Sequence, residues 1–237
     1  MTVLVSSLNV RGVGGGSVIT QFSDSFNRAS GGDTGSSLGP NWAGGVVLRT
    51  PLVNPPSLPT WGIAAGFGGI NVLSIGSSTG TYNPNTQFFG FLHPMVYTQG
   101  LVSGKTQFAQ CTINKMSSSG GSIGAGVGVF VDSAGNSGYI IQIVNDTHNF
   151  FFQAVRGVSA PVTFASGAST VVDGDTIRIE VTAGSPNSIR WFKNGTLQNS
   201  TTDSNLAHGV PGFFCDVNGQ TGSEQCEWKN WSGGIGP

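Results

Sequence analysis

Short apolar runs separated by turn-forming residues are the feature of this sequence that most restricts its fold. Gly, Asn, Asp and Ser, which favour tight turns, cluster between the runs. No window shows a sustained 3.6-residue period with helix caps. The pattern predicts an all-β protein, an antiparallel sandwich or barrel. Residues 22–42 are predicted to be a short strand followed by a polar loop. The further predicted strands span residues 61–75, 87–97, 105–116, 123–131, 138–145, 149–158, 175–182, 188–193, 210–217 and 225–231.

The clearest local signal lies in residues 188–203, SIRWFKNGTLQNSTTD. Ile189 and Trp191 alternate with Arg190 and Phe192 up to Asn194-Gly195, and the pattern resumes at Thr196 and Leu197. Asn-Gly between alternating residues predicts a two-residue hairpin, because a type I′ turn needs positive φ at both central positions. The preceding run, residues 177–181, alternates aliphatic and charged side chains, which gives that strand one core face and one outer face.

The composition supports a folded chain and excludes two classes of partner. Its 38 glycines punctuate apolar runs such as residues 126–131 and 139–144, and fifteen Phe supply core material. Only 9% of residues are charged, the net charge is −1 and the ten Lys and Arg are scattered, so we expect no nucleic-acid binding. No apolar run reaches the roughly 18 residues of a membrane span, so we expect no membrane insertion.

The N-terminal part differs in composition from the rest of the chain. Residues 1–20 are apolar and Gly-rich, and their first cation, Arg11, follows the Val-Leu-Val patch, so we expect no signal peptide. Residues 51–59 carry four prolines, which predicts an extended or loop segment. We therefore expect an extended arm at 1–20 that docks on neighbouring subunits, and a β-sandwich domain at 21–237.

Two stretches carry a family resemblance. The first is SDSFNRASGG followed by SSLGPNW, at residues 23–32 and 36–42, and the second is residues 174–214, GDTIRIEVTAGSPNSIRWFKNGTLQNSTTDSNLAHGVPGFF. Together they resemble concanavalin A-like, laminin-G-like jelly-roll modules over roughly residues 22–232. The resemblance implies two packed antiparallel sheets. That fold is common in glycan-binding modules, some glycan hydrolases and many bacteriophage virion proteins.

The carboxylates do not form the pair that glycan hydrolysis needs. Hydrolases place two carboxylates about 5 to 9.5 Å apart, and this chain has three Glu: Glu180, Glu224 and Glu227. Glu224 and Glu227 would point to opposite faces of one strand, because their spacing is odd. The Glu-x-Asp-x-Glu strand of the family's hydrolytic members is missing, and Asp173 and Asp175 fit a turn. We therefore expect no enzyme and no catalytic residue.

Other chemical motifs are weak. Gly76–Gly80 has the Gly-x-Ser-x-Gly spacing of a nucleophile elbow, but no helix is predicted after it. His93, His148 and His208 have no acidic or Cys partner at ligand spacing, so we expect no metal site and no cofactor. The loop 131–138 has only two side chains suited to calcium.

The cysteines do not form a disulfide framework. Cys111, Cys215 and Cys226 are odd in number, although Cys215 and Cys226 could face each other across a hairpin with its turn near residues 218–223. Two reduced thiols on neighbouring strands is the favoured interpretation, because no secretory signal supports oxidation.

Sugar-stacking aromatic faces are a further candidate. Trp61, Tyr97, Trp228 and Trp231 could supply such faces, but burial in the core explains these residues better. The sequence therefore assigns no ligand-binding residue.

Two functional classes fit these observations. The first, which we favour, is a non-enzymatic virion protein, a capsid decoration or tail accessory protein of a bacteriophage. It would assemble with itself and with other virion proteins, adhere to cell-surface glycans and be located in the virion. The second is a lectin-like carbohydrate-binding module or a glycan-active enzyme domain, with cell-surface glycans as partners.

Overall fold

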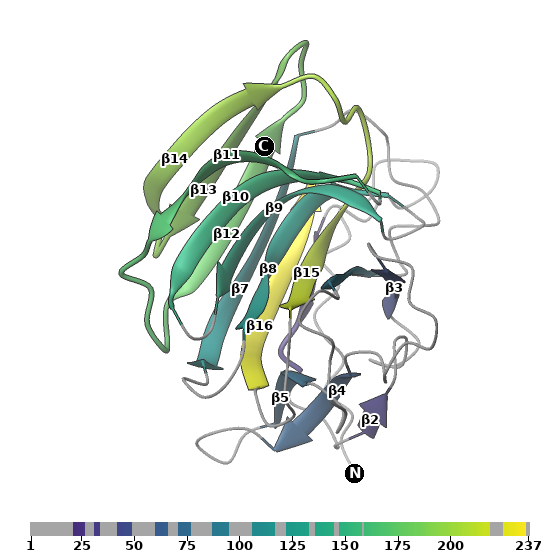
Figure 1. The fold of residues 1–237 in the computed structure, drawn as a ribbon, viewed down its shortest axis with the longest axis vertical. Helices are drawn as coiled ribbons and strands as arrows, with labels where there is room; N and C mark the ends of the chain where they lie inside the picture. Colours follow the sequence, from purple (N-terminus) through teal and green to yellow (C-terminus); the bar gives the residue numbers. More distant parts are fainter. Residues whose placement is uncertain are drawn as a thin grey trace, which may run out of the picture.

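Two antiparallel sheets pack face to face in the computed structural model (Figure 1). The structure describes residues 21–26, 31–33, 42–48, 60–65, 71–76, 87–94, 106–116, 122–132, 136–144, 147–157, 159–218 and 225–235. These residues contain strands and turns but no helix, which confirms the all-β prediction. None of the described segments is a helix of the length and hydropathy that a membrane span requires. The predicted arm, residues 1–20, lies outside the described residues.

One sheet has nine strands within the described part of the chain. Its β16 (Gln225–Ile235) pairs with β7 (Gln107–Met116) along one edge, and with β5 (Asn71–Gly76) and β1 (Gln21–Asp24) one after the other along the opposite edge. In order across the sheet, the strands are β14 (Thr196–Asp203), β13 (Asn187–Lys193), β12 (Thr176–Thr182), β7 (Gln107–Met116), β16 (Gln225–Ile235), β5 (Asn71–Gly76), β4 (Thr60–Ala65) and β2 (Gly31–Asp33), with β1 (Gln21–Asp24) beside β16.

The other sheet has seven strands among the described residues. In order they are β11 (Val162–Ala168), β10 (Asn149–Arg156), β9 (Ser137–Val144), β8 (Ser122–Val131), β15 (Val210–Asn218), β6 (Gln87–Pro94) and β3 (Trp42–Leu48). The predicted strand at 61–75 is therefore two antiparallel strands, β4 and β5. Strands β2, β3 and β11 were not predicted from the sequence, and β2 lies in a stretch predicted to be a polar loop.

The core lies between the sheets and is built by alternation. On β12, Ile177, Ile179 and Val181 are fully buried, while Arg178 and Glu180 lie on the outer face. From the opposite sheet Phe213 meets Trp228, with ring centroids 5.3 Å apart in an edge-to-face arrangement. Burial of each such side chain stabilises the fold by about 1.5–3 kcal/mol.

The Asn194-Gly195 hairpin is confirmed. The two residues have φ of 50° and 78°, and Lys193 pairs with Thr196 on either side of them. The Asn194 side chain also ties this turn to the start of β12, because its Nδ2 donates to Asp175 Oδ1 at 2.6 Å and its Oδ1 accepts from the Thr176 N–H at 2.8 Å. The Gly-Asp and Asn-Gly motifs of the family resemblance are therefore in contact.

The two parts of the first stretch of the resemblance are also in contact with each other. Asp24, at the end of β1, accepts hydrogen bonds from the Phe26 N–H at 2.7 Å and from Trp42 Nε1 at 2.8 Å. The Trp42 ring lies against Phe22, Phe26 and Trp231. This buried carboxylate fixes the first strand against the core, so the motif that suggested the family has a structural role.

Candidate functional site

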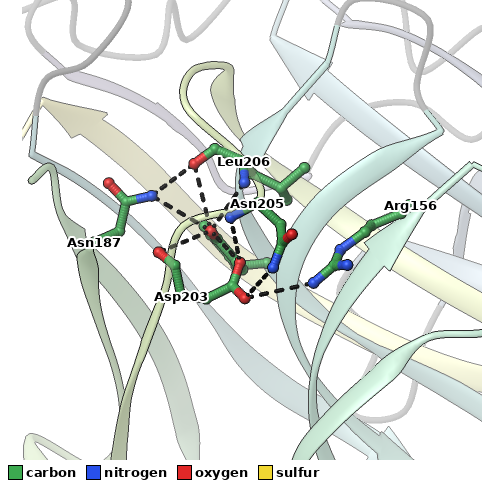
Figure 2. A network of polar contacts seen from close by, with 6 residues as sticks. Arg156, Asn187, Asp203, Asn205 and Leu206 are labelled. Atoms are coloured by element: carbon green, nitrogen blue, oxygen red, sulfur yellow. Dashed lines mark hydrogen bonds and ion pairs between the residues drawn. The ribbon is translucent and has the colours of Figure 1, made fainter. Parts of the chain in front are cut away.

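A network of polar contacts joins the two sheets at one end of the sandwich (Figure 2). The Tyr139 hydroxyl, from β9, donates to Asp203 Oδ2 at the end of β14, at 2.8 Å. The same oxygen accepts from the Leu206 N–H at 3.2 Å and from Asn187 Nδ2 at 3.3 Å. We call these residues, with Asn205 and Arg156, the Tyr139–Asp203 network. It anchors the segment that follows β14 to the opposite sheet.

Asp203 is the centre of this network and is held ionised. It also accepts from the Asn205 N–H at 2.8 Å and lies 3.4 Å from Arg156 Nη2. Burial raises the pKa of Asp203, but the donors from Asn205 and Tyr139 and the charge of Arg156 outweigh it, so the pKa falls below its ordinary value. Burial, with Asp203 nearby, raises the pKa of Tyr139 to about 12, which keeps the hydroxyl a donor.

Asn187 connects two segments that are far apart in the sequence. Its Oδ1 accepts from the Gly184 N–H at 3.1 Å, and its Nδ2 donates to the Leu206 carbonyl at 2.6 Å. The side chain is almost fully buried, with 4% exposed. The amide therefore holds the turn between β12 and β13 at a fixed separation from the segment after β14.

These two segments form the walls of a pocket. Its volume is about 450 Å³, within the range of about 300–1,000 Å³ of small-molecule sites. No charged side chain lines it, and the hydroxyls of Ser185 and Ser204 have no hydrogen-bond partner among the described residues. The lining consists of Ala183, Gly184, Ser185, Asn187, Ser204, Leu206 and Ala207. The pocket thus offers free hydroxyls beside small apolar surfaces.

Glu180 and Glu227 lie far apart, and each is bound by neighbouring side chains. Glu180 is bound by Arg178 at 2.7 Å and by Arg190 at 3.0 Å. Glu227 accepts from Asn114 Nδ2 at 2.7 Å. Their registers on β7 differ by seven positions, which is about 23 Å at roughly 3.3 Å per residue. These two carboxylates do not flank a common bond.

The remaining acidic candidates have structural partners or lie outside the described residues. Asp173 accepts from Lys115 Nζ at 2.8 Å and from the Met116 N–H at 3.0 Å. Asp175 accepts from the Val172 N–H at 2.9 Å and from Asn194, as expected of turn residues. Glu224 lies outside the described residues.

The aromatic candidates are not sugar-stacking faces where the structure describes them. Trp228 and Trp231 are fully buried in the core, as the burial interpretation predicted. Trp61 lies on β4, but its side chain is outside the described part, as is all of Tyr97.

The histidines and the elbow motif do not meet in a site. His148 occupies a turn with φ of 52°, and its N–H donates to the Val144 carbonyl. His208 is exposed after β14 and does not line the pocket, and His93 lies on β6 without a described side chain. Of the elbow motif, Gly76 ends β5 and the rest lies outside the described residues.

The residues suited to metals and disulfides also have other roles. Asp132 Oδ1 accepts from the Asn136 N–H at 2.8 Å, within its own loop. No group of three His, Cys, Asp or Glu that could hold a metal ion occurs in the described segments. All three cysteines are free and buried, and burial raises their pKa. The expected hairpin between Cys215 and Cys226 is wrong, because β15 and β16 belong to opposite sheets.

Sequence reasoning missed the pocket. Tyr139 belongs to the apolar run at 139–144, and no local motif singles out Asn187. The one available signal was Asp203 before a loop that ends in Gly209-Val210-Pro211-Gly212, which is part of the family resemblance. That signal predicts the loop but not the residues from other strands that contact it.

Comparison with known proteins supports the fold. No protein-family model matches the chain, and no curated protein matches its sequence. A family 16 glycoside hydrolase endo-glucanase from Bacteroides ovatus is similar in structure, with a TM-score of 0.51 and 12% identity over 89% of this chain and 98% of that one. At this identity, the similarity shows a jelly-roll β-sandwich and nothing about activity.

Two further structures have lower scores. The carbohydrate-binding module CBM66 from Bacillus subtilis has a TM-score of 0.49 and 14% identity over 80% of this chain and 94% of that one. An alginate lyase from Chlorella virus also has a TM-score of 0.49, with 11% identity over 84% of this chain and 94% of that one.

Proposed function

We propose that this chain is a carbohydrate-binding β-sandwich module without hydrolytic activity, and that the pocket beside the Tyr139–Asp203 network is its binding site. The observation that carries the proposal is the chemistry of the pocket. A sugar presents hydroxyls at its edges and C–H groups on its faces. The walls offer matching groups, the hydroxyls of Ser185 and Ser204 beside the apolar side chains of Ala183, Leu206 and Ala207.

The rigidity of the walls supports binding. Asn187 joins them directly, and Tyr139 and Asp203 anchor one of them to the opposite sheet. A preformed site loses little conformational entropy when a ligand enters. The endo-glucanase with the same fold acts on a glycan, which makes carbohydrate the first ligand class to test.

Binding to a panel of glycans, measured for the parent and for a variant with a filled pocket, tests this proposal. We expect Ala207→Trp to fill the pocket and to lower the affinity for any bound oligosaccharide at least tenfold in calorimetric titration. Ala168→Trp, at an exposed position on β11, is the matched control and should bind like the parent. The absence of binding across the panel, or equal binding by both variants, contradicts the proposal.

A second candidate function is structural assembly, and one observation favours it. Both sheets end on the same side of the molecule in edge strands, β14 and β11, as the contact of Phe150 on β10 with Trp191 on β13 indicates. Strand β14 is largely exposed and has no Lys or Pro, residues that commonly protect an edge from pairing with another chain. An open edge of this kind can accept a strand from a second copy or from a neighbour's arm.

Light scattering tests this second candidate. We expect deletion of residues 1–20, or Thr202→Lys on the exposed edge, to lower the mass of any oligomer and to leave the domain folded. An unchanged mass for both variants removes the assembly role. The virion location expected from the sequence stays a prediction, whose direct test is the presence of the chain in purified particles.

A further inference from the structure

We infer that Arg190 on β13 and Ser200 on β14, which are paired on the outer face of their sheet, bind a carboxylate or sulfate group of an acidic glycan. The site lies outside the pocket and depends on contacts of its own. Only the assignment of a glycan as the carrier of the anionic group rests on the proposed function.

Two arginines share one carboxylate on this face. Arg178 binds Glu180 Oε1 through Nε and Nη2, each at 2.7 Å, and its Nη1 donates to Gln110 Oε1 at 3.1 Å. Arg190 Nη2 donates to the other oxygen, Glu180 Oε2, at 3.0 Å. The cluster therefore carries two positive charges and one negative charge, although the whole chain has a net charge of −1.

Arg190 is the arginine that can accept a further anion. Its side chain is 42% exposed, compared with 26% for Arg178. Within the described part of the chain, Nη2 is its one nitrogen with an acceptor, so Nη1 is free to donate. Glu180 holds the guanidinium in place, and the Phe192 ring centre lies 5.8 Å from its central carbon. A guanidinium fixed in this way loses little freedom when it binds a second oxyanion.

Ser200 places a hydroxyl beside this guanidinium. It pairs directly with Arg190 in the β13–β14 register, so the two side chains share a face with their Cβ atoms about 5 Å apart. Ser200 is exposed, and its hydroxyl has no hydrogen-bond partner among the described residues. Ser188 and Thr202, the next outer positions on these strands, bring no second carboxylate to Arg190. Carboxylate and sulfate groups have several acceptor oxygens, which suits a guanidinium and a hydroxyl side by side.

The position of this site relative to the pocket indicates a glycan as the carrier. Asn187, which bridges the pocket walls, lies three residues before Arg190 on β13, about 10 Å away at roughly 3.3 Å per residue. A glycan of a few sugar residues spans this distance, with one sugar in the pocket and an acidic group at Arg190.

Arg190→Gln tests the anion site. Neutral, uronate and sulfated oligosaccharides of equal length are titrated into the full chain at low salt. We expect the parent to bind an acidic series at least fivefold more tightly than the neutral one, and Arg190→Gln to bind both equally. High salt should reduce the preference of the parent, because exposed charges are screened. The variant should fold, since Glu180 keeps Arg178 as its partner, and circular dichroism checks this.

Two further variants sharpen the test. Lys115→Gln is the matched control, because it also removes an exposed cation, but one that is already paired with Asp173, and it should leave the preference unchanged. Ser200→Asp adds a carboxylate beside Arg190 from an exposed position and should abolish the preference as Arg190→Gln does.

The outcomes separate this inference from the proposed function. Equal affinity of the parent for neutral and acidic series, or a preference that Arg190→Gln and Ser200→Asp both retain, overturns the anion site and leaves the proposed function standing. Acidic binding that requires Arg190 but is unchanged in Ala207→Trp, without any neutral binding, supports the anion site and contradicts the proposed pocket. Poly-glutamate that binds as tightly as an acidic glycan of equal charge overturns the glycan as carrier.

Discussion

At the scale of single residues, Gly209 has no room for a side chain. Its φ is 150°, and an added Cβ would lie 2.2 Å from the carbonyl carbon of Phe130. Gln107 holds these two segments together, since its Oε1 accepts from the Phe130 N–H at 3.2 Å and its Nε2 donates to the Gly209 carbonyl at 2.5 Å. The backbone cannot move apart without breaking this bridge.

We therefore expect Gly209→Ala to lower the free energy of unfolding by about 3 kcal/mol, because backbone strain of this kind costs about 1–3 kcal/mol and the bridge is lost as well. Gly157→Ala is the control. It has φ of 57° but nothing within 4 Å of the added Cβ, so only the cost of the left-handed conformation, about 1–2 kcal/mol, applies. Urea denaturation of both variants gives the comparison, and equal losses would show that Gly209 is not sterically restricted.

Asp203 gives a second prediction at this scale, through pH. Its folded-state pKa lies below the unfolded value, so its contribution to stability is complete above about pH 4 and is lost as the pH falls through the folded pKa. We expect Asp203→Asn to be less stable than the parent at neutral pH. Its free energy of unfolding should also fall less steeply than that of the parent on acidification below pH 4. Parallel curves for the two proteins would contradict the role given to this carboxylate.

At the scale of elements, the β13–β14 hairpin gives a direct test of the turn. Gly195 has φ of 78°, a conformation that a β-branched residue adopts only under strain. Gly195→Val should lower the free energy of unfolding by more than about 1 kcal/mol, and Gly195→Asn should cost less because Asn tolerates this conformation. Thermal unfolding compares the three proteins. If the Val variant melts like the parent, the strain is absent.

The same element shows how far sequence reasoning reaches. The turn and β12 were predicted because Asn-Gly and alternation have few structural meanings. Strand β14 was predicted only at its first residues, because an exposed edge strand needs no apolar alternation. Strand β3, which contains Ala-Gly-Gly, and β11 were not predicted. Sequences with such weak strand propensity form strands only because neighbouring strands pair with them.

At the scale of the whole molecule, the pocket depends on contacts between elements remote in sequence. Tyr139 lies 64 residues from Asp203 and 48 from Asn187, and the three meet only because the two sheets pack together. The fold class followed from patterns within short windows. The pocket did not, because no local pattern states which hydroxyl from the opposite sheet will meet a given loop.

The arrangement of carboxylates across the whole molecule leads to the last prediction, that purified protein releases no sugar from polysaccharides. Hydrolysis needs an acid and a second carboxylate about 5 to 9.5 Å apart, whereas Glu180 and Glu227 are about 23 Å apart along β7. Each is also bound, Glu180 by two arginines and Glu227 by Asn114.

Reducing-end assays on neutral and acidic polysaccharides should stay at background for the parent, Glu180→Gln and Glu227→Gln alike. Turnover by the parent that either substitution abolishes would mean that a carboxylate serves chemistry here, and that binding is only the first step of a reaction. Turnover that both variants retain would point to a catalytic group outside the described residues. Background values for all three, together with binding of a glycan, are what a binding module requires, because affinity for a sugar needs matched hydroxyls and surfaces but no group that transfers a proton.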